Sequence, residues 1–272
     1  MQNRPLLNAT RMAPEKNNHS HKLKDFAPVY CINLNSDKEK WGFMEDQFKY
    51  WGVRNYTRVT AYDGRVSNLR EIIEGGYPDG MISQEVGCTT SHLKAIKQFY
   101  DSGEPYAIIM EDDCELDLVN LWNFSWSEFF DRVPYDWDVC QLAVICTSRV
   151  SATIHKRFVD EFSTACYLVT RHHAEKLIRL HCSGENYKLD NGVKPRAVAD
   201  ELIYNSGNTY TIPIFLYNNG LESSIHPDHI DLFHKKSYDA QLLFWKEIGS
   251  KEAIDVLMKF DPLAKNLMGL LL

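Results

Sequence analysis

Short apolar runs alternate with helical segments along most of this chain, and this alternation restricts the possible folds more than any other feature. Runs with the length and composition of buried strands lie at residues 29–34, 56–61, 106–110, 137–145, 162–170 and 209–217. Segments with a helical period lie at residues 37–51, 84–100, 122–130, 171–181 and 197–204. Repeated strand–helix units with short connections favour an α/β fold with a mainly parallel sheet covered by helices on both faces. Ligands of such folds bind at the carboxyl ends of the strands.

The first predicted helix has clear signals at both of its ends. Ser36 can cap its N-terminus, and Gly52 ends it. Between them, apolar side chains recur at spacings of three and four residues, at Trp41, Met44, Phe48 and Trp51. This spacing predicts an amphipathic helix whose apolar face packs on the sheet.

The chain divides into three predicted segments. Its 272 residues, with 44% hydrophobic and 25% charged side chains, are typical of an ordinary globular protein. Residues 1–26 form a polar leader that we expect to be disordered or loosely packed. Residues 27–235 form the globular domain, in which 221–234 is predicted to be a loop, and residues 236–272 form a helical extension packed on the domain.

Composition and charge exclude several classes of protein. The formal net charge of −7, without a basic stripe, argues against a protein that mainly binds nucleic acid. Apolar runs fall short of the roughly 20 residues that span a bilayer, and no signal peptide is recognisable, which predicts a soluble, cytoplasmic protein without a transmembrane segment. Because the seven cysteines form no C-x-x-C pair, we expect buried reduced thiols rather than a disulfide framework or a zinc site.

Three consecutive acids follow a buried strand, and they are the most informative chemical feature of the sequence. Glu111, Asp112 and Asp113 come directly after the apolar run 106–110. Carboxylates at the mouth of a buried strand repel one another unless a cation or hydrogen-bond donors meet them. In an extended backbone Glu111 and Asp113 would face one site while Asp112 points away. Oxygen ligands favour Mg²⁺ or Mn²⁺, although acids at a helix N-terminus would give the same pattern.

Further motifs surround these acids in a fixed order. Residues 85–92 read E-V-G-C-T-T-S-H, and residues 106–113 read Y-A-I-I-M-E-D-D. They resemble the patterns E-x-G-C-x-x-S-H and I-L-E-D-D of glycosyltransferase family 25, the lipopolysaccharide and collagen galactosyltransferase family. The resemblance extends from about residue 28 to residue 226 in the family's order, with matches at 29–33 (the opening strand), 58–64 (R-x-x-A-x-D-G), 165–177 (A-Y-L-x-S-R-x-G-A-x-K-L) and 199–202 (V-D-x-x-L).

The resemblance implies a GT-A fold, in which a Rossmann-like nucleotide-binding half joins an acceptor half. It also implies a nucleotide-sugar donor, a divalent ion (Mn²⁺ or Mg²⁺) and inversion at the anomeric carbon. Carried onto this sequence, Glu111 and Asp113 are metal ligands, and Asp112 belongs to the same diphosphate motif. The residues implied to hold the uridine are Asn33, Leu34, Ala61, Asp63 and Gly64. Asp63 and Gly64 also fit a simple β-turn, and both interpretations can hold together.

The acceptor half of the site requires a base beside the acceptor hydroxyl, opposite the leaving diphosphate. Asp200 is the candidate base, with Glu201 second, although both also fit the first turn of a helix. His226 is a candidate to complete the metal shell or to contact the diphosphate from the predicted loop. His92 is better explained by a structural hydrogen bond than by a phosphate contact.

Together these features predict a metal-dependent inverting glycosyltransferase that moves a hexose from a UDP-sugar to a hydroxyl of a glycan or glycoprotein. The family resemblance favours galactose, then glucose. Residues 162–164 and His172-His173 depart from the family pattern, so donor or acceptor choice can differ. One alternative is a sugar nucleotidyltransferase, but residues 31–36 are not the Gly-rich basic loop that such enzymes carry. Another is a non-catalytic glycan-binding protein of the same fold.

Overall fold

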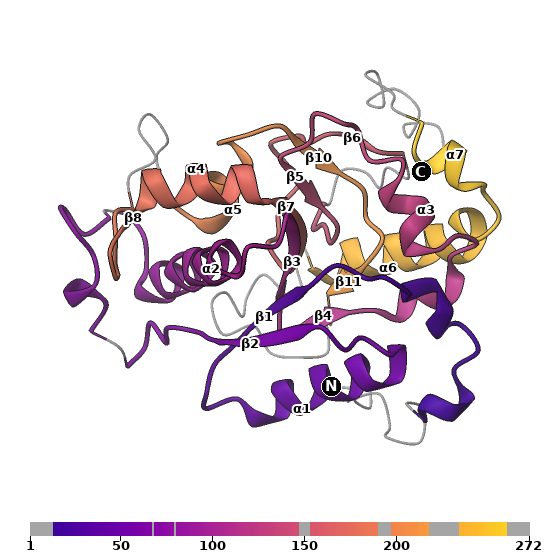
Figure 1. The fold of residues 1–272 in the computed structure, drawn as a ribbon, viewed down its shortest axis with the longest axis horizontal. Coiled ribbons are helices and arrows are strands. Elements are labelled where there is room, and N and C mark those ends of the chain that lie inside the picture. The colour runs from indigo at the N-terminus through magenta and orange to yellow at the C-terminus, as the bar shows by residue number, and fades with distance from the viewer. Residues whose placement is uncertain are drawn as a thin grey trace.

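A seven-stranded sheet runs through the middle of the molecule (Figure 1). The computed structural model describes residues 13–66, 68–78, 80–146, 153–189, 197–217 and 234–259. In spatial order the strands of the sheet are β2 (Tyr56–Thr60), β1 (Val29–Asn33), β3 (Tyr106–Glu111), β7 (Cys166–Thr170), β5 (Val139–Gln141), β10 (Thr209–Thr211) and β6 (His155–Lys156). Two small antiparallel ladders accompany it, β4 (Cys114–Glu115) with β11 (Leu216–Tyr217) and β8 (Cys182–Ser183) with β9 (Asn186–Tyr187).

Most strands of the main sheet point in the same direction. β1 is parallel to β2 and β3, and β5 is parallel to β10. β7 is antiparallel to both of its neighbours, β3 and β5, and β6 is antiparallel to β10. The fold class expected from the sequence, a Rossmann-like α/β architecture with a mainly parallel sheet, is therefore confirmed, with one central strand reversed.

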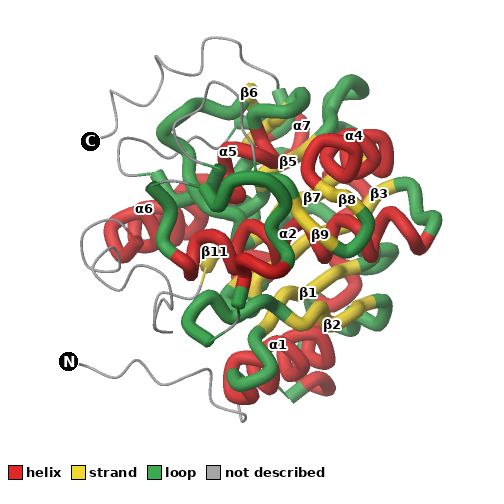
Figure 2. The backbone as a smooth tube through the Cα atoms, turned by 90° about the vertical axis from the view of Figure 1, so that its left-hand side faces the viewer, coloured by secondary structure: helices red, strands yellow, loops and turns green. Residues whose placement is uncertain are grey.

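Seven α-helices are described, and they surround the sheet (Figure 2). They are α1 (Lys38–Trp51), α2 (Ser83–Ser102), α3 (Trp126–Phe130), α4 (Arg171–His181), α5 (Ala199–Tyr204), α6 (Lys235–Phe244) and α7 (Ile254–Leu257). Short 3₁₀ turns lie at Pro14–Lys16, Ser20–Leu23, Leu69–Glu71 and Asp117–Leu121, and a π-helical turn at Trp245–Gly249 extends α6.

The N-cap of α1 is one residue later than the sequence predicted. The Asp37 side chain, not Ser36, accepts a hydrogen bond from the Lys40 backbone N–H at 3.0 Å. Ser36 lies inside a turn that the Asp37 N–H closes onto the Leu34 carbonyl at 3.0 Å. Asp37 is as good a cap as serine, and the turn fixes its position. The predicted stop at Gly52 is confirmed, since Gly52 has a φ of 71°.

Two predicted elements are shorter in the structure. The strand expected over 209–217 divides into β10 and β11, because Pro213 has no N–H to continue the ladder of hydrogen bonds. The helix expected over 122–130 begins only after Ser125, which caps α3 by accepting the Glu128 N–H at 3.3 Å. Local chain chemistry thus overrides the apolar pattern at both places.

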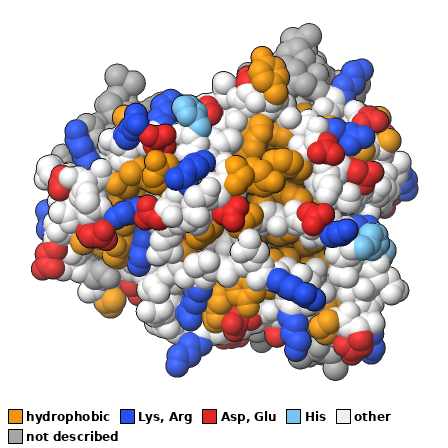
Figure 3. Space-filling view, in the orientation of Figure 1, with side chains coloured by type: hydrophobic (Ala, Val, Ile, Leu, Met, Phe, Trp, Pro, Cys, Tyr) orange, Lys and Arg blue, Asp and Glu red, His pale blue; other side chains and the backbone are white. Residues whose placement is uncertain are grey.

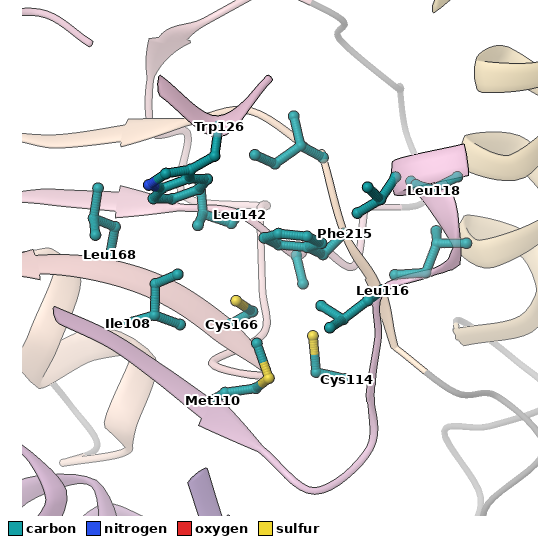
Figure 4. Close-up of a cluster of buried hydrophobic side chains, with 14 of the residues drawn as sticks. Ile108, Met110, Cys114, Leu116, Leu118, Trp126, Leu142, Cys166, Leu168 and Phe215 are labelled. Carbon is teal, nitrogen blue, oxygen red and sulfur yellow. The ribbon is translucent and has the colours of Figure 1, made fainter. Parts of the chain in front are cut away.

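Side-chain alternation along the strands builds a separate core on each face of the sheet. Val29 and Cys31 of β1 pack with α1, whereas Tyr30 and Ile32 pack with α2 on the other face. The α1 face continues into an aromatic cluster in which Trp126 and Phe215 lie over strand residues such as Ile108 (Figure 4). Burying one large apolar side chain contributes about 1.5–3 kcal/mol, so both faces hold the sheet firmly.

Segments near both chain ends contact the sheet domain. Lys22 is buried and donates hydrogen bonds to the carbonyls of Val119 at 3.1 Å and Asn120 at 3.3 Å. Beyond α6, the Trp245 indole N–H donates to the Pro213 carbonyl at 2.8 Å. Most of the predicted loop 221–234 and the last 13 residues, 260–272, lie outside the described residues.

All seven cysteines are free thiols, and five of them are buried. Within the described ranges, no helix is both long and apolar enough to cross a membrane. Charges of both signs are interspersed over the face shown in Figure 3, around an apolar central area.

Candidate functional site

An open cleft lies at the carboxyl edge of the parallel part of the sheet. Its lining comes from five segments: the end of β1, the end of β3, the start of α1, the loop after β2, and the first half of α2. The lining residues are Ile32, Asn33, Leu34, Asp37, Lys40, Ala61, Tyr62, Asp63, Gly64, Arg65, Gln84, Cys88, Ser91, His92, Glu111 and Asp112.

The structure brings most of the sequence-predicted site residues to this cleft. The five residues assigned to the uridine all line it, and so do Glu111 and Asp112. Asp113 and Asp200 are not part of the lining. His226 lies outside the described residues.

Two glycines allow α2 to pack directly on the loop that follows β2. A Cβ atom on Gly64 would lie 2.1 Å from the Ser83 carbonyl oxygen, and one on Gly87 would lie 2.7 Å from the Tyr62 carbonyl oxygen. The Tyr62 N–H also donates to the Ser91 hydroxyl at 2.8 Å. Only glycine permits this approach, so these residues set the shape of one cleft wall.

Asp112 is held by two side chains from the neighbouring segments. Asn33 Nδ2 donates to Asp112 Oδ2 at 2.6 Å, and Lys40 Nζ lies 3.7 Å from Asp112 Oδ1. Arg58 in turn donates to the Asn33 side-chain oxygen. Burial raises the pKa of Asp112 to about 6, although Lys40 and Asn33 act in the opposite direction. The side chain remains 15% exposed, toward the cleft.

Glu111 is tied to the opposite side of the site. Glu111 Oε1 accepts a hydrogen bond from the Thr164 hydroxyl at 2.8 Å, and His92 Nε2 lies 3.3 Å from the same oxygen. His92 Nδ1 lies 3.1 Å from the Tyr167 hydroxyl. Burial raises the pKa of Glu111, but His92 and Thr164 outweigh it and leave the pKa below its usual value. Glu111 therefore has the lowest pKa of the three acids and is the last of them to become protonated as the pH falls.

Asp113 has a buried carboxylate oxygen, Oδ1, without a hydrogen-bond partner among the described residues. Burial and then the charge of Glu111 raise the pKa of Asp113 to about 7. The expected alternation of the three acids is wrong: β3 ends at Glu111, and 112–113 form a turn, so Asp112 lines the cleft instead of pointing away. An uncompensated buried oxygen beside two further carboxylates fits a divalent cation held by oxygen ligands.

Asp200 lies in the first turn of α5, near Glu111 and His92, but it is not one of the residues that line the cleft. Asp200 Oδ2 accepts the Ser163 N–H at 3.4 Å, and Oδ1 is buried without a partner in the described part of the chain. Burial raises the pKa of Asp200 to about 6, and Arg157 opposes this shift. Glu201, by contrast, accepts a hydrogen bond from Asn205 within its own helix.

Asp63 lines the cleft and also closes a local turn. Asp63 Oδ1 accepts the Arg65 backbone N–H at 2.9 Å, as in a local turn, and both carboxylate oxygens accept from the Arg65 guanidinium at 2.9 Å. These hydrogen bonds lower the pKa of Asp63. Asp63 therefore stays ionised at the cleft mouth while it also closes a turn.

Nine of the lining residues were not assigned to the site by the sequence, and four of them carry groups that can bind a ligand or a metal: Lys40, Arg65, Cys88 and His92. Lys40 lies in α1 but is not one of the apolar residues that predicted this helix. Its position in the first turn of a helix that follows β1 is the signal that would have found it, because that turn lies at the carboxyl edge of the sheet. His92 is 1% exposed and hydrogen-bonded as expected, yet it also forms part of the cleft floor.

Comparisons with known proteins were consistent with the motif pattern. The family model described as "Glycosyltransferase family 25 (LPS biosynthesis protein)" matches residues 26–191, more than half of the chain. No curated protein matches the chain. Among solved structures, one titled "Crystal Structure of A197 from STIV" aligns with a TM-score of 0.33 and 9% identity, over 70% of this chain and 83% of that one. That likeness is too low to carry an argument.

Proposed function

This chain belongs to glycosyltransferase family 25, and from that premise we propose that it is a metal-dependent inverting hexosyltransferase. The donor is a UDP-sugar, UDP-galactose before UDP-glucose, and the acceptor is a hydroxyl of a glycan or glycoprotein. One observation carries the proposal: all five residues assigned to the uridine line the same cleft as Glu111 and Asp112.

In this proposal the first two βα loops hold the nucleoside. Ala61 is small enough to let the base stack closely, and Asp63, kept ionised by Arg65, accepts a ribose hydroxyl. Asn33 contributes from the end of β1, where Asp112 and Arg58 fix its side-chain amide. The diphosphate then lies toward the acidic turn and Lys40.

The acidic turn supplies the ligands for the divalent ion. Glu111 and Asp113 would hold Mn²⁺ or Mg²⁺, with His226 as a further candidate, and the bound ion neutralises charge on the departing diphosphate. Lys40 Nζ lies 3.7 Å from Asp112 Oδ1, which supports a cation beside the proposed diphosphate position. The acids, through the ion they hold, and Lys40 would therefore both stabilise the negative charge of the departing diphosphate.

Asp200 is the proposed base. It takes the proton of the acceptor hydroxyl as that oxygen attacks the anomeric carbon from the side opposite the diphosphate. Its raised pKa, about 6, leaves it ionised at neutral pH while strengthening it as a proton acceptor. The Ser163 N–H orients the carboxylate through Oδ2, and the acceptor hydroxyl would supply the missing hydrogen bond to the buried Oδ1 once it has entered the site.

A panel of nucleotide sugars incubated with Mn²⁺ tests the donor assignment, with release of free nucleotide as the readout. Slow hydrolysis needs no acceptor, so the unknown acceptor does not limit the experiment. We expect UDP-galactose to react fastest, UDP-glucose next, and the reaction to stop with EDTA. Asp112→Asn should abolish turnover, while Glu201→Gln serves as the matched control. A preference for a non-UDP donor, or equal rates in EDTA, would contradict the proposal.

A further inference from the structure

Three side chains with metal-binding atoms converge on the cleft floor, and only one of them belongs to the acidic turn. They are Cys88, His92 and Glu111, and their ligand atoms all lie within 4.8 Å of one another. Cys88 and His92 are four residues apart on α2, so they share one face of that helix. Glu111, the last residue of β3, meets them from the sheet. All three line the cleft.

The separation of two of the ligand atoms matches a tetrahedral ion. His92 Nε2 and Glu111 Oε1 are 3.3 Å apart. Bonds of about 2.0–2.1 Å at a tetrahedral angle place two such donor atoms roughly 3.3 Å apart. A metal ion can thus bridge this pair without any movement of the two side chains.

Both of these ligands are also oriented by an outer partner. His92 Nδ1 lies 3.1 Å from the Tyr167 hydroxyl, which turns Nε2 toward Glu111. The Thr164 hydroxyl donates to Glu111 Oε1 at 2.8 Å. Histidine ligands of metal sites typically carry such a hydrogen bond on the far ring nitrogen, which fixes the ring before the ion arrives. Thr164 bonds the same Glu111 oxygen that faces His92, and so it holds the carboxylate in place.

We propose that Cys88, His92 and Glu111 form a three-ligand site for a transition-metal ion of the Zn²⁺ class, with its fourth position open to the cleft. A thiolate and an imidazole favour Zn²⁺ or Co²⁺ over Mg²⁺ and Mn²⁺. Binding replaces the thiol proton of Cys88, which passes to solvent, and nothing is oxidised or reduced. The site is distinct from the oxygen-ligand set of the proposed transferase, although Glu111 belongs to both, so we expect Zn²⁺ to weaken Mn²⁺ binding there.

A titration of the metal-free protein with Co²⁺ tests this site without nucleotide or acceptor. Thiolate ligation gives an intense near-ultraviolet charge-transfer band, and tetrahedral Co²⁺ gives visible bands that octahedral Co²⁺ lacks. We expect both signals to saturate at one equivalent and Zn²⁺ to erase them at one equivalent. Elemental analysis after desalting should find one Zn²⁺ per chain.

Cysteine variants decide whether the signal comes from this site. Cys88→Ser should remove the charge-transfer band and weaken Zn²⁺ binding at least tenfold, and Cys88→Ala serves if the serine variant does not fold. Cys182→Ser is the matched control, because Cys182 is the other partly exposed cysteine and lies outside the cleft lining. It should behave like the parent. The proposal is overturned if the parent gives no thiolate band, or if the band persists without Cys88 or disappears without Cys182.

Discussion

Three adjacent carboxyl groups at the end of β3 differ in acid strength because each has different partners. Glu111 has its pKa held down by His92 and Thr164, whereas burial raises the pKa of Asp112 to about 6 and that of Asp113 to about 7. Without a cation, the turn therefore carries less than its formal charge at neutral pH. A cation would restore full ionisation, which makes this turn sensitive to both pH and metal.

The first prediction concerns the stability of the metal-free protein. The Asp113 carboxyl keeps its proton up to about pH 7 in the folded state, but it loses it near the usual value of 3.8 when unfolded. The folded state therefore binds this proton more tightly than the unfolded state does. As a result, the contribution of Asp113 to the free energy of unfolding falls as the pH rises from about 3.8 to about 7. Asp113→Asn removes that loss, so with EDTA at pH 8 we expect the variant to be about 1–3 kcal/mol more stable than the parent.

The measurement is urea unfolding of parent and variant at pH 5 and pH 8. The difference between the two proteins should shrink toward pH 5, where the parent carboxyl is protonated as well. Comparing the two cancels titrating groups that do not interact with Asp113. Glu111 does interact with it, so any change in the Glu111 pKa is part of the measured difference. An advantage for the variant that is as large at pH 5 as at pH 8 would mean that packing, not ionisation, is responsible.

Asp200 gives the second prediction, which separates chemistry from donor binding. Asp200→Asn should bind UDP and metal normally but lose transfer by about 10²- to 10⁴-fold, the usual contribution of a positioned base. In the parent, transfer should decline as pH falls through about 6, because the base becomes protonated. Calorimetry with UDP and a transfer assay across pH 5–8 measure both effects.

Glu201→Gln is the control for this experiment. Glu201 is the next residue on α5 and bonds within its own helix, so its variant should keep most of its activity. Full transfer by Asp200→Asn, or a dead Glu201→Gln that still binds donor, would move the base to another residue.

At the scale of elements, the site depends on how closely α2 packs on the loop after β2. Gly87→Ala would put a methyl group 2.7 Å from the Tyr62 carbonyl oxygen. Relief of that overlap requires α2 or the loop to move, at a cost of about 1–3 kcal/mol. Because Tyr62 and Cys88 line the cleft on either side of this contact, we also expect weaker UDP binding.

Gly42→Ala is the matched control for the Gly87→Ala variant, which is the third prediction. Gly42 is also inside a helix, α1, but a Cβ there meets nothing within 4 Å. That variant should gain about 0.5–1 kcal/mol from reduced chain entropy and leave UDP binding unchanged. Chemical denaturation measures the stability of the two variants, and calorimetry measures their UDP binding. If Gly87→Ala and Gly42→Ala behave alike, the close approach of α2 to the loop does not explain the glycine at position 87.

At the scale of the whole molecule, the fourth prediction is that UDP and Mn²⁺ together stabilise the fold far more than either alone. The proposed site joins segments from β1, β2 and β3, so a ligand that spans it links distant parts of the chain. Ligand that binds only the folded state raises stability by mass action, by about 2.7 kcal/mol at 100 times its dissociation constant. A thermal melt with each addition measures this, and an equal shift in EDTA would contradict it.

Much of the architecture follows from local sequence patterns, because strand alternation and helical periods act over a few residues. The strands 29–33, 56–60 and 106–111 and the helix that ends at Gly52 lie within two residues of their predicted ends. Errors occurred where a single residue outweighs a pattern. Pro213 divided a predicted strand, and Asp37 replaced Ser36 as a helix cap.

The sequence by itself determined the fold class, the family and the presence of an acidic turn at the carboxyl edge of the sheet, since motifs and periodicity are carried by neighbouring residues. Only the tertiary structure decided which of those acids faces the cleft, because the end of β3 at Glu111 depends on its pairing with β1 and β7. It also decided that Lys40 and Asn33 hold Asp112, and that Cys88 and His92 meet Glu111. Those contacts join residues 19 to 79 positions apart, a distance over which no local pattern carries information.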